Sequence, residues 1–238
     1  MQFNFEQIRF TLFYTQSLFE STSNLETIFS SFFSSEPSLF SSNKASHQRN
    51  VQSLIGLENL SISAKIDING NRLDIVLDID PDSAVQDLLA IKKTMELILE
   101  KIPEILPSNP IRIALGLLAS KSANSVTESI NFVKIFLPAL SSISDLAELG
   151  IRLNKKHNFN NIDINGIISI NSVKQIRKKI TPNEFVFLQI PQSEMQDACI
   201  FEFDFNTVPE IQLENKNIQH IFDFLKDKIF FYLEKGIE

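Results

Sequence analysis

The sequence predicts an α+β protein in which a curved, mostly antiparallel sheet carries long amphipathic helices on one face. Two observations lead to this class. Residues 60–80 contain two runs of strictly alternating apolar and polar residues, joined at Asn69, Gly70 and Asn71, which is a strong hairpin signal. Apolar residues also recur at helical spacing over long stretches that follow Ser83 and Asn215.

The first forty residues predict a strand and then a helix. Phe10 and Leu12 continue the alternation that begins at Ile8, whereas Phe3 and Phe5 have the opposite parity. A β-bulge near residues 6–7 would reconcile the two halves of one strand. A capping-box pair of residues at 23 and 26 begins a helix, and the Ser- and Asn-rich range 34–50 is expected to be an exposed loop.

The remaining elements follow from caps, prolines and periodicity. A helix is expected from Ser83 to Pro103, then a buried strand in 111–120 because that run is almost continuously apolar. Ser125 and Glu128 have capping-box spacing and predict a further helix. Strands are expected at 162–170 and 199–205, and the last helix should end at Gly236.

Domain organisation is left with two alternatives. Residues 1–238 are long enough for one large domain. The order of strand, hairpin and long helix in the first half is loosely repeated in the second half. Two similar, intertwined halves of about 1–120 and 121–238 are therefore the other alternative, although no residue-level repeat supports them.

Composition narrows the class of protein. The net charge is −7 and the pI is near 5.1, which disfavours a protein that coats phosphate backbones. A single cysteine, Cys199, excludes an internal disulfide and a multi-cysteine zinc site. The N-terminus does not resemble a secretory signal, and no stretch is long and apolar enough to span a membrane. We therefore expect a cytoplasmic protein.

Acidic residues cluster in two strand-like runs. Asp78 and Asp80 share one strand face, and Glu202 and Asp204 share another. If these two strands paired, the four carboxylates could hold Mg²⁺ or Mn²⁺ in a hydrolase or nuclease. The preferred interpretation is that a sheet covered on one face places its polar residues on the other. No metal site is therefore assigned.

Other groups of residues suggest binding rather than catalysis. The segments 152–157 and 174–179 concentrate positive charge, with Phe159 as a stacking candidate, and would suit RNA or another anion. The preferred interpretation is that they are two solvated loops. Phe32, Phe33 and Phe40 could form an apolar surface for a partner or a second copy. The basic residues in question are Arg152, Lys155, Lys156, Lys178 and Lys179.

Nucleotide and hydrolase motifs are absent from the sequence. It has no phosphate-binding glycine loop and no nucleophile elbow, and its three histidines lack zinc-ligand spacing. Cys199 lies in an apolar run and is expected to be a core residue. No cofactor is predicted.

Two short motifs resemble a known family. The run RIALGLLA at 112–119, after a helix that ends in prolines, and the run CIFEFDFN at 199–206, before an amphipathic helix, resemble strands of a sporadically distributed bacterial family of uncharacterised α+β proteins. Gly116, Leu117 and Ala119 stand where the family has Arg, Tyr and Asn, so no role of those polar residues is carried over. The patchy distribution implied by the resemblance would suit mobile-element or defence genes.

Two classes of function follow. The first is a non-catalytic interaction or assembly module, a subunit of a larger complex, an antitoxin-like partner or a holding chaperone, which binds another protein or itself. The second is the metal-dependent hydrolase that would use the four carboxylates. The first is preferred, and nucleic acid is not favoured as a partner.

Overall fold

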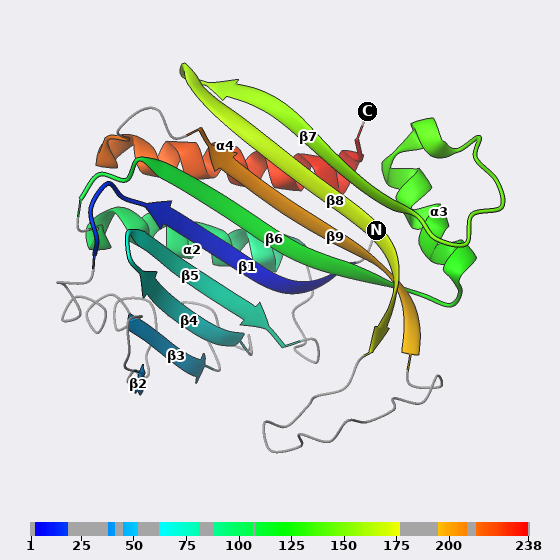
Figure 1. The fold of residues 1–238 in the computed structure, drawn as a ribbon, viewed down its shortest axis with the longest axis horizontal. Coiled ribbons are helices and arrows are strands. Elements are labelled where there is room, and N and C mark those ends of the chain that lie inside the picture. The colour runs from blue at the N-terminus through cyan, green and yellow to red at the C-terminus, as the bar shows by residue number, and fades with distance from the viewer. Residues whose placement is uncertain are drawn as a thin grey trace.

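A computed structural model of the chain describes residues 3–18, 38–40, 45–51, 62–80, 88–106, 108–176, 195–208 and 213–237. All its strands belong to one antiparallel sheet of nine strands, in the order β2-β3-β4-β5-β1-β6-β9-β8-β7 (Figure 1). The strands are β1 Asn4–Phe13, β2 Ser38–Phe40, β3 Ala45–Val51, β4 Ile62–Asn69, β5 Arg72–Ile79, β6 Arg112–Ala123, β7 Gly150–Phe159, β8 Ile162–Ile176 and β9 Met195–Thr207. The predicted α+β class is confirmed.

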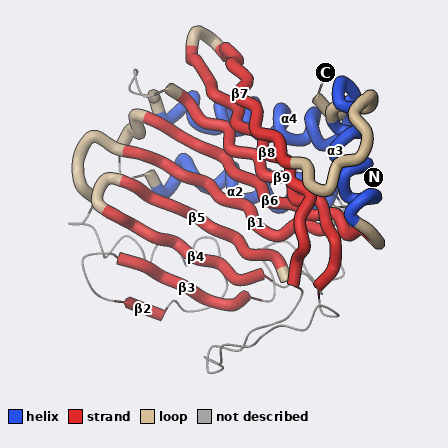
Figure 2. The backbone as a smooth tube through the Cα atoms, turned by 45° about the vertical axis from the view of Figure 1, so that its right-hand side comes forward, coloured by secondary structure: helices blue, strands red, loops and turns tan. Residues whose placement is uncertain are grey.

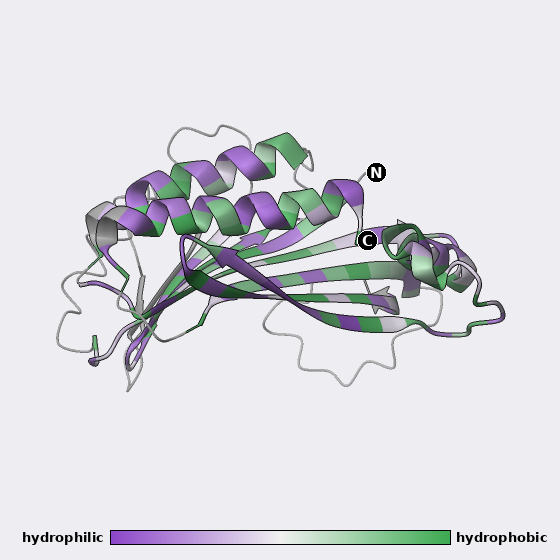
Figure 3. Cartoon of the chain, turned by 90° about the horizontal axis from the view of Figure 1, so that it is seen from above, coloured by the Kyte–Doolittle hydropathy of each residue, from purple (hydrophilic) through white to green (hydrophobic). Residues whose placement is uncertain are grey.

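In the described part of the chain, three α-helices lie on one face of this sheet: α2 Leu88–Ile105, α3 Val126–Phe136 and α4 Asn215–Lys235. Helices α2 and α4 run side by side across the middle of the sheet, and α3 covers one end (Figures 2 and 3). The short 3-10 helix η2, Pro138–Leu140, follows α3 in the chain. Within the described residues, the opposite face carries no helix (Figure 3). We call this opposite face the open face.

The hydrophobic core lies between the sheet and the helices. In β5, Leu73, Ile75, Leu77 and Ile79 are at most 4% exposed, because alternate side chains of a strand point to the same face. Aromatic rings join the layers: Phe10 of β1 packs edge-on against Phe222 of α4 at 5.8 Å. At the other end, the rings of Phe136 in α3 and Phe201 in β9 lie 4.6 Å apart.

Several local features agree with the residues that predicted them. The register of β1 against β6 shifts between Phe5 and Gln7, which is the expected bulge. Gly70 has φ 62° in the two-residue turn of the β4–β5 hairpin, where glycine is favoured at the first position. Ser125 caps α3 by accepting a hydrogen bond from the N–H of Glu128, and Gly236 ends α4 with φ 78°.

Other expectations are corrected. The range 34–50, expected to be a loop, contains β2 and most of β3. The segment 150–159, whose basic residues were placed in a loop, is the ten-residue strand β7. Residue 120, at the expected boundary between two halves, lies inside β6, whose neighbours in the sheet are β1 and β9. The start of the long helix at Ser83 lies outside the described residues.

Candidate functional site: the open face and the edge strand

The centre of the open face is built from four neighbouring strands, β5, β1, β6 and β9. Their paired residues form rows that cross the sheet. One row is Asp78, Gln7, Leu118 and Glu202, the next is Val76, Arg9, Gly116 and Asp204, and a third is Asp74, Thr11, Ala114 and Asn206. Carboxylates therefore flank a centre that contains Arg9.

The acidic side chains of these rows contact polar or basic neighbours. The Arg9 guanidinium lies 3.6 Å from a carboxylate oxygen of Asp204, and Gln7 donates a hydrogen bond of 2.7 Å to Asp78. Asp74 accepts hydrogen bonds from Thr11 and from Arg72. The charges of the open face thus form a network of mixed sign, held on rigid strands.

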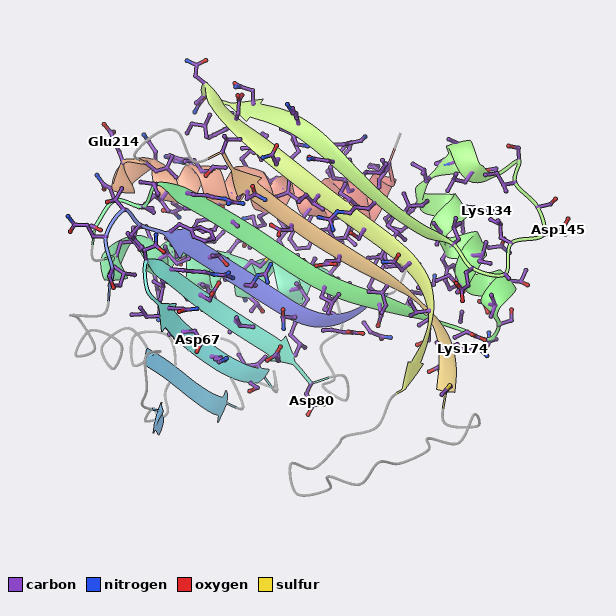
Figure 4. All side chains as sticks on the ribbon, viewed as in Figure 1. Asp67, Asp80, Lys134, Asp145, Lys174 and Glu214 are labelled. Carbon is purple, nitrogen blue, oxygen red and sulfur yellow. The ribbon has the colours of Figure 1, made fainter. Side chains whose placement is uncertain are left out.

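The condition for the alternative interpretation, a metal site, is not met. Strands β5 and β9 are separated by β1 and β6, which places Asp78 about 14 Å from Glu202 at the usual strand spacing. Asp80 follows the end of β5, at the margin of the sheet (Figure 4). Within the residues that the structure describes, no group of three His, Cys, Asp or Glu side chains could hold a metal ion.

A small hollow lies in the middle of the open face. It has a volume of about 60 Å³ and is lined by Gln7, Arg9, Glu202 and the residues around Gly116. The Arg9 side chain lies over Gly116, where a Cβ atom would be in ordinary van der Waals contact with it at 3.6 Å. Typical sites for organic ligands have volumes of several hundred Å³, so this hollow suits a few water molecules rather than a substrate.

The basic residues predicted as an anion site belong partly to β7, which forms one edge of the sheet. Arg152 and Lys156 are exposed on the open face, whereas Lys155 points to the helix side, where its ammonium group lies 5.3 Å from the centre of the Tyr232 ring. Lys178 and Lys179 lie outside the described residues. A joint basic patch of both segments therefore stays a prediction.

Aromatic rings fill the helix side of β7. Phe159, the predicted stacking residue, packs on Phe224 of α4 with ring centres 4.8 Å apart. His157 stacks on Phe205 of β9 at 5.8 Å. Burial lowers the pKa of His157, and the positive charges of Lys228 and Lys155 lower it further. These contacts make Phe159 part of the packing between β7 and α4 instead of a platform for a nucleobase.

The apolar surface expected from phenylalanines is not described. Phe32 and Phe33 lie outside the described residues, and Phe40 lies in β2, whose side chains are not described. The structure exposes other large apolar side chains: Leu89 of α2 is 70% exposed, Ile135 of α3 58% and Phe231 of α4 52%. The sequence did not single these out because each belongs to a helix with a well-formed apolar stripe.

Cys199 is a core residue, as predicted. Its side chain is fully buried in β9, and burial raises the pKa of the thiol to about 12. Such a thiol is almost entirely protonated at neutral pH and is a poor nucleophile. A Cys and His nucleophilic pair therefore has no support at this position.

Comparisons with known proteins give no relative. No protein-family model, no curated protein and no solved structure matches this chain. None of the described helices is both long enough and apolar enough to cross a membrane.

Proposed function

We propose that this protein is a non-catalytic interaction or assembly module, a subunit or accessory protein of a larger bacterial complex in the cytoplasm. One observation carries the proposal: a broad sheet face remains uncovered by the described helices and presents a fixed pattern of paired charges, such as Arg9 with Asp204. Charge patterns on rigid elements give specificity towards a partner with the complementary pattern.

The mixed sign of the open face favours protein over nucleic acid as the partner. Asp74, Asp78, Glu202 and Asp204 lie among Arg9 and Arg72, and carboxylates at such density repel a phosphate backbone. The alternative of a metal-dependent hydrolase loses its support, because it required β5, which Asp80 follows, to pair with β9, and these two strands are separated by β1 and β6.

We also propose that the chain consists of two similar halves around the central pair of β1 and β6. Support comes from the strand order, since β5, β4 and β3 follow outward from β1 as β9, β8 and β7 follow outward from β6. Each set of strands is also followed in the chain by one long helix, α2 or α4. Two coexpressed fragments, cut between α2 and β6, should then reassemble into one soluble protein, and fragments that never associate would contradict this proposal.

The test of the proposed interaction reverses one ion pair and keeps the fold. In the double variant Arg9→Asp with Asp204→Arg, the two side chains still attract each other, but their charges point the opposite way on the open face. Wild-type protein purified from its native host should bring down a defined protein, and the double variant should lose it.

The matched control is Lys93→Glu, an exposed position of α2 on the helix side of the sheet, which should retain the partner. Circular dichroism and melting temperature establish that each variant is folded. If no protein is retained by wild type, or if the partner is retained equally by the double variant, the open face is not the interaction surface.

A further inference from the structure

Strand β7 ends the sheet, and no described strand pairs with its outer edge. It pairs with β8 over all ten residues, Gly150 to Phe159, without a shift of register, and it contains no proline. In an antiparallel edge strand, alternate backbone N–H and C=O groups point away from the sheet. Exposed edges of this kind are templates for another strand.

The charge of β7 is entirely positive. Arg152, Lys155 and Lys156 lie within Gly150–Phe159, which contains no acidic residue, in a chain whose net charge is −7. Among the described residues, Arg152 and Lys156 form no ion pair, and both are exposed. The edge should therefore attract carboxylates on the open face, where the side chains of Arg152 and Lys156 lie.

The other face of β7 carries the apolar side chains of Ile151, Leu153 and Phe159, with Lys155 and His157 between them lying against aromatic rings. Ile151 and Leu153 are partly buried and pack against the hydrophobic core. Further along this face, the His157 ring contacts Phe224 of α4, and Lys228 lies near both Phe224 and the half-exposed Phe231. A strand added beside β7 would extend this largely apolar and aromatic layer with its own alternate side chains.

We propose that β7 binds an extended segment of another protein as a tenth strand, with acidic side chains on the open face and apolar side chains on the helix side. This inference rests on the proposed interaction function and specifies its partner. A second copy of β7 is a poorer occupant, because antiparallel pairing of two copies brings strands of like charge together, and like charges across strands are unfavourable.

The probe for this proposal is a synthetic ten-residue peptide in which valine alternates with glutamate. Its affinity is measured by fluorescence anisotropy with the full chain. The double variant Arg152→Glu with Lys156→Glu should weaken binding about tenfold or more, because two cross-strand attractions become repulsions. The variant Lys93→Glu with Lys235→Glu changes the net charge equally at two exposed positions outside β7 and should leave the affinity unchanged.

A second measurement identifies the mode of binding. Addition of a strand should protect alternate backbone amides of β7 from hydrogen exchange, namely those that do not bond to β8. Absence of binding, binding that is insensitive to the reversal at Arg152 and Lys156, or binding without protection of β7 amides would overturn the proposal. Self-association of the protein through β7 in the absence of peptide would also overturn the proposal.

The two proposals fail separately, because they involve different residues. If the peptide does not bind β7, but the double variant Arg9→Asp with Asp204→Arg no longer binds the native partner, only the inference about β7 is refuted. If that double variant binds the native partner as well as wild type does, but β7 binds the peptide as described, the edge strand is supported as an interaction site and the open face is refuted as one.

Discussion

Gly166 offers a sharp test of how the edge of the sheet is packed. This buried residue of β8 pairs with Phe205 of β9 on one side and with Lys155 of β7 on the other. A Cβ atom at position 166 would lie 2.5 Å and 2.8 Å from two ring carbons of Phe205, well inside van der Waals contact. The glycine therefore leaves the space that the Phe205 ring occupies.

The Phe205 ring has little freedom to move away. It is fully buried, stacks on His157 at 5.8 Å and contacts Tyr232 at 6.0 Å. Overpacking of a core typically costs about 1–3 kcal/mol, and the reduced freedom of the unfolded chain returns about 0.4–1 kcal/mol when glycine becomes alanine. The variant Gly166→Ala should therefore lose about 1.3 kcal/mol of unfolding free energy, which is the difference between the midpoints of the two ranges.

Gly116 provides the matched control on the opposite face of the sheet. A Cβ atom there would meet Arg9 at 3.6 Å, an ordinary contact distance, so Gly116→Ala should be neutral or more stable by up to about 1 kcal/mol. Urea denaturation followed by circular dichroism measures both variants, with equal m-values as the check that the same transition is compared. If Gly166→Ala is as stable as wild type, or Gly116→Ala is destabilised equally, the packing argument is wrong.

Three further outcomes are expected. Cys199 should not react with a thiol reagent at pH 8 until urea unfolds the chain, because burial raises its pKa to about 12; rapid labelling of the folded protein would contradict its burial. Replacement of Lys226, buried between Glu96 at 3.2 Å and Asp223 at 3.0 Å, by methionine should cost about 1–3 kcal/mol in urea denaturation. Burial alone would lower the pKa of Lys226, but the hydrogen bonds to Asp223 and Glu96 raise it overall. The loss of stability in the methionine variant should therefore persist below pH 10.5 and disappear as pH rises through the higher folded pKa. A loss that is the same at every pH would show that the contacts of Lys226 with the two carboxylates are not its cause. Because the pKa of His157 is lowered from 6.5 on folding, stability should fall as pH drops from 6.5 towards the folded pKa, and the variant His157→Phe, compared by thermal melts at several pH values, should lack this part of the decrease.

Local patterns in the sequence were sufficient to predict many elements. The parity change between Phe5 and Ile8 predicted the bulge in β1, and the alternation at 62–79 with Gly70 predicted the β4–β5 hairpin. These signals involve residues close together in the chain, where sterics and the burial of one face decide the conformation. The helix cap at Ser125 and the end of α4 at Gly236 were also predicted from such local signals.

The missed strand β7 shows where such patterns become ambiguous. Ile151, Leu153 and Phe159 alternate correctly, but Lys155 and His157 occupy inward positions between them. The structure accommodates both polar side chains against aromatic rings, Lys155 over Tyr232 and His157 on Phe205. The turn that follows, with positive φ at Asn160 and Asn161, is a hairpin signal that could have identified the strand.

The acidic residues show that the order of strands in the sheet cannot be read from local sequence patterns. Asp78, Glu202 and Asp204 were correctly assigned to strand faces and Asp80 follows the end of β5, yet the chemistry of this set depended on whether β5 and β9 are neighbours in the sheet. That order is a property of the whole fold, in which β1 and β6 take the central positions. Because Gln7 and Leu118 stand between Asp78 and Glu202 in the same row, the carboxylates meet Arg9 and amide groups instead of one another. A charged face of mixed sign is the direct consequence, and this is the physical reason for our proposal that the open face binds a protein partner.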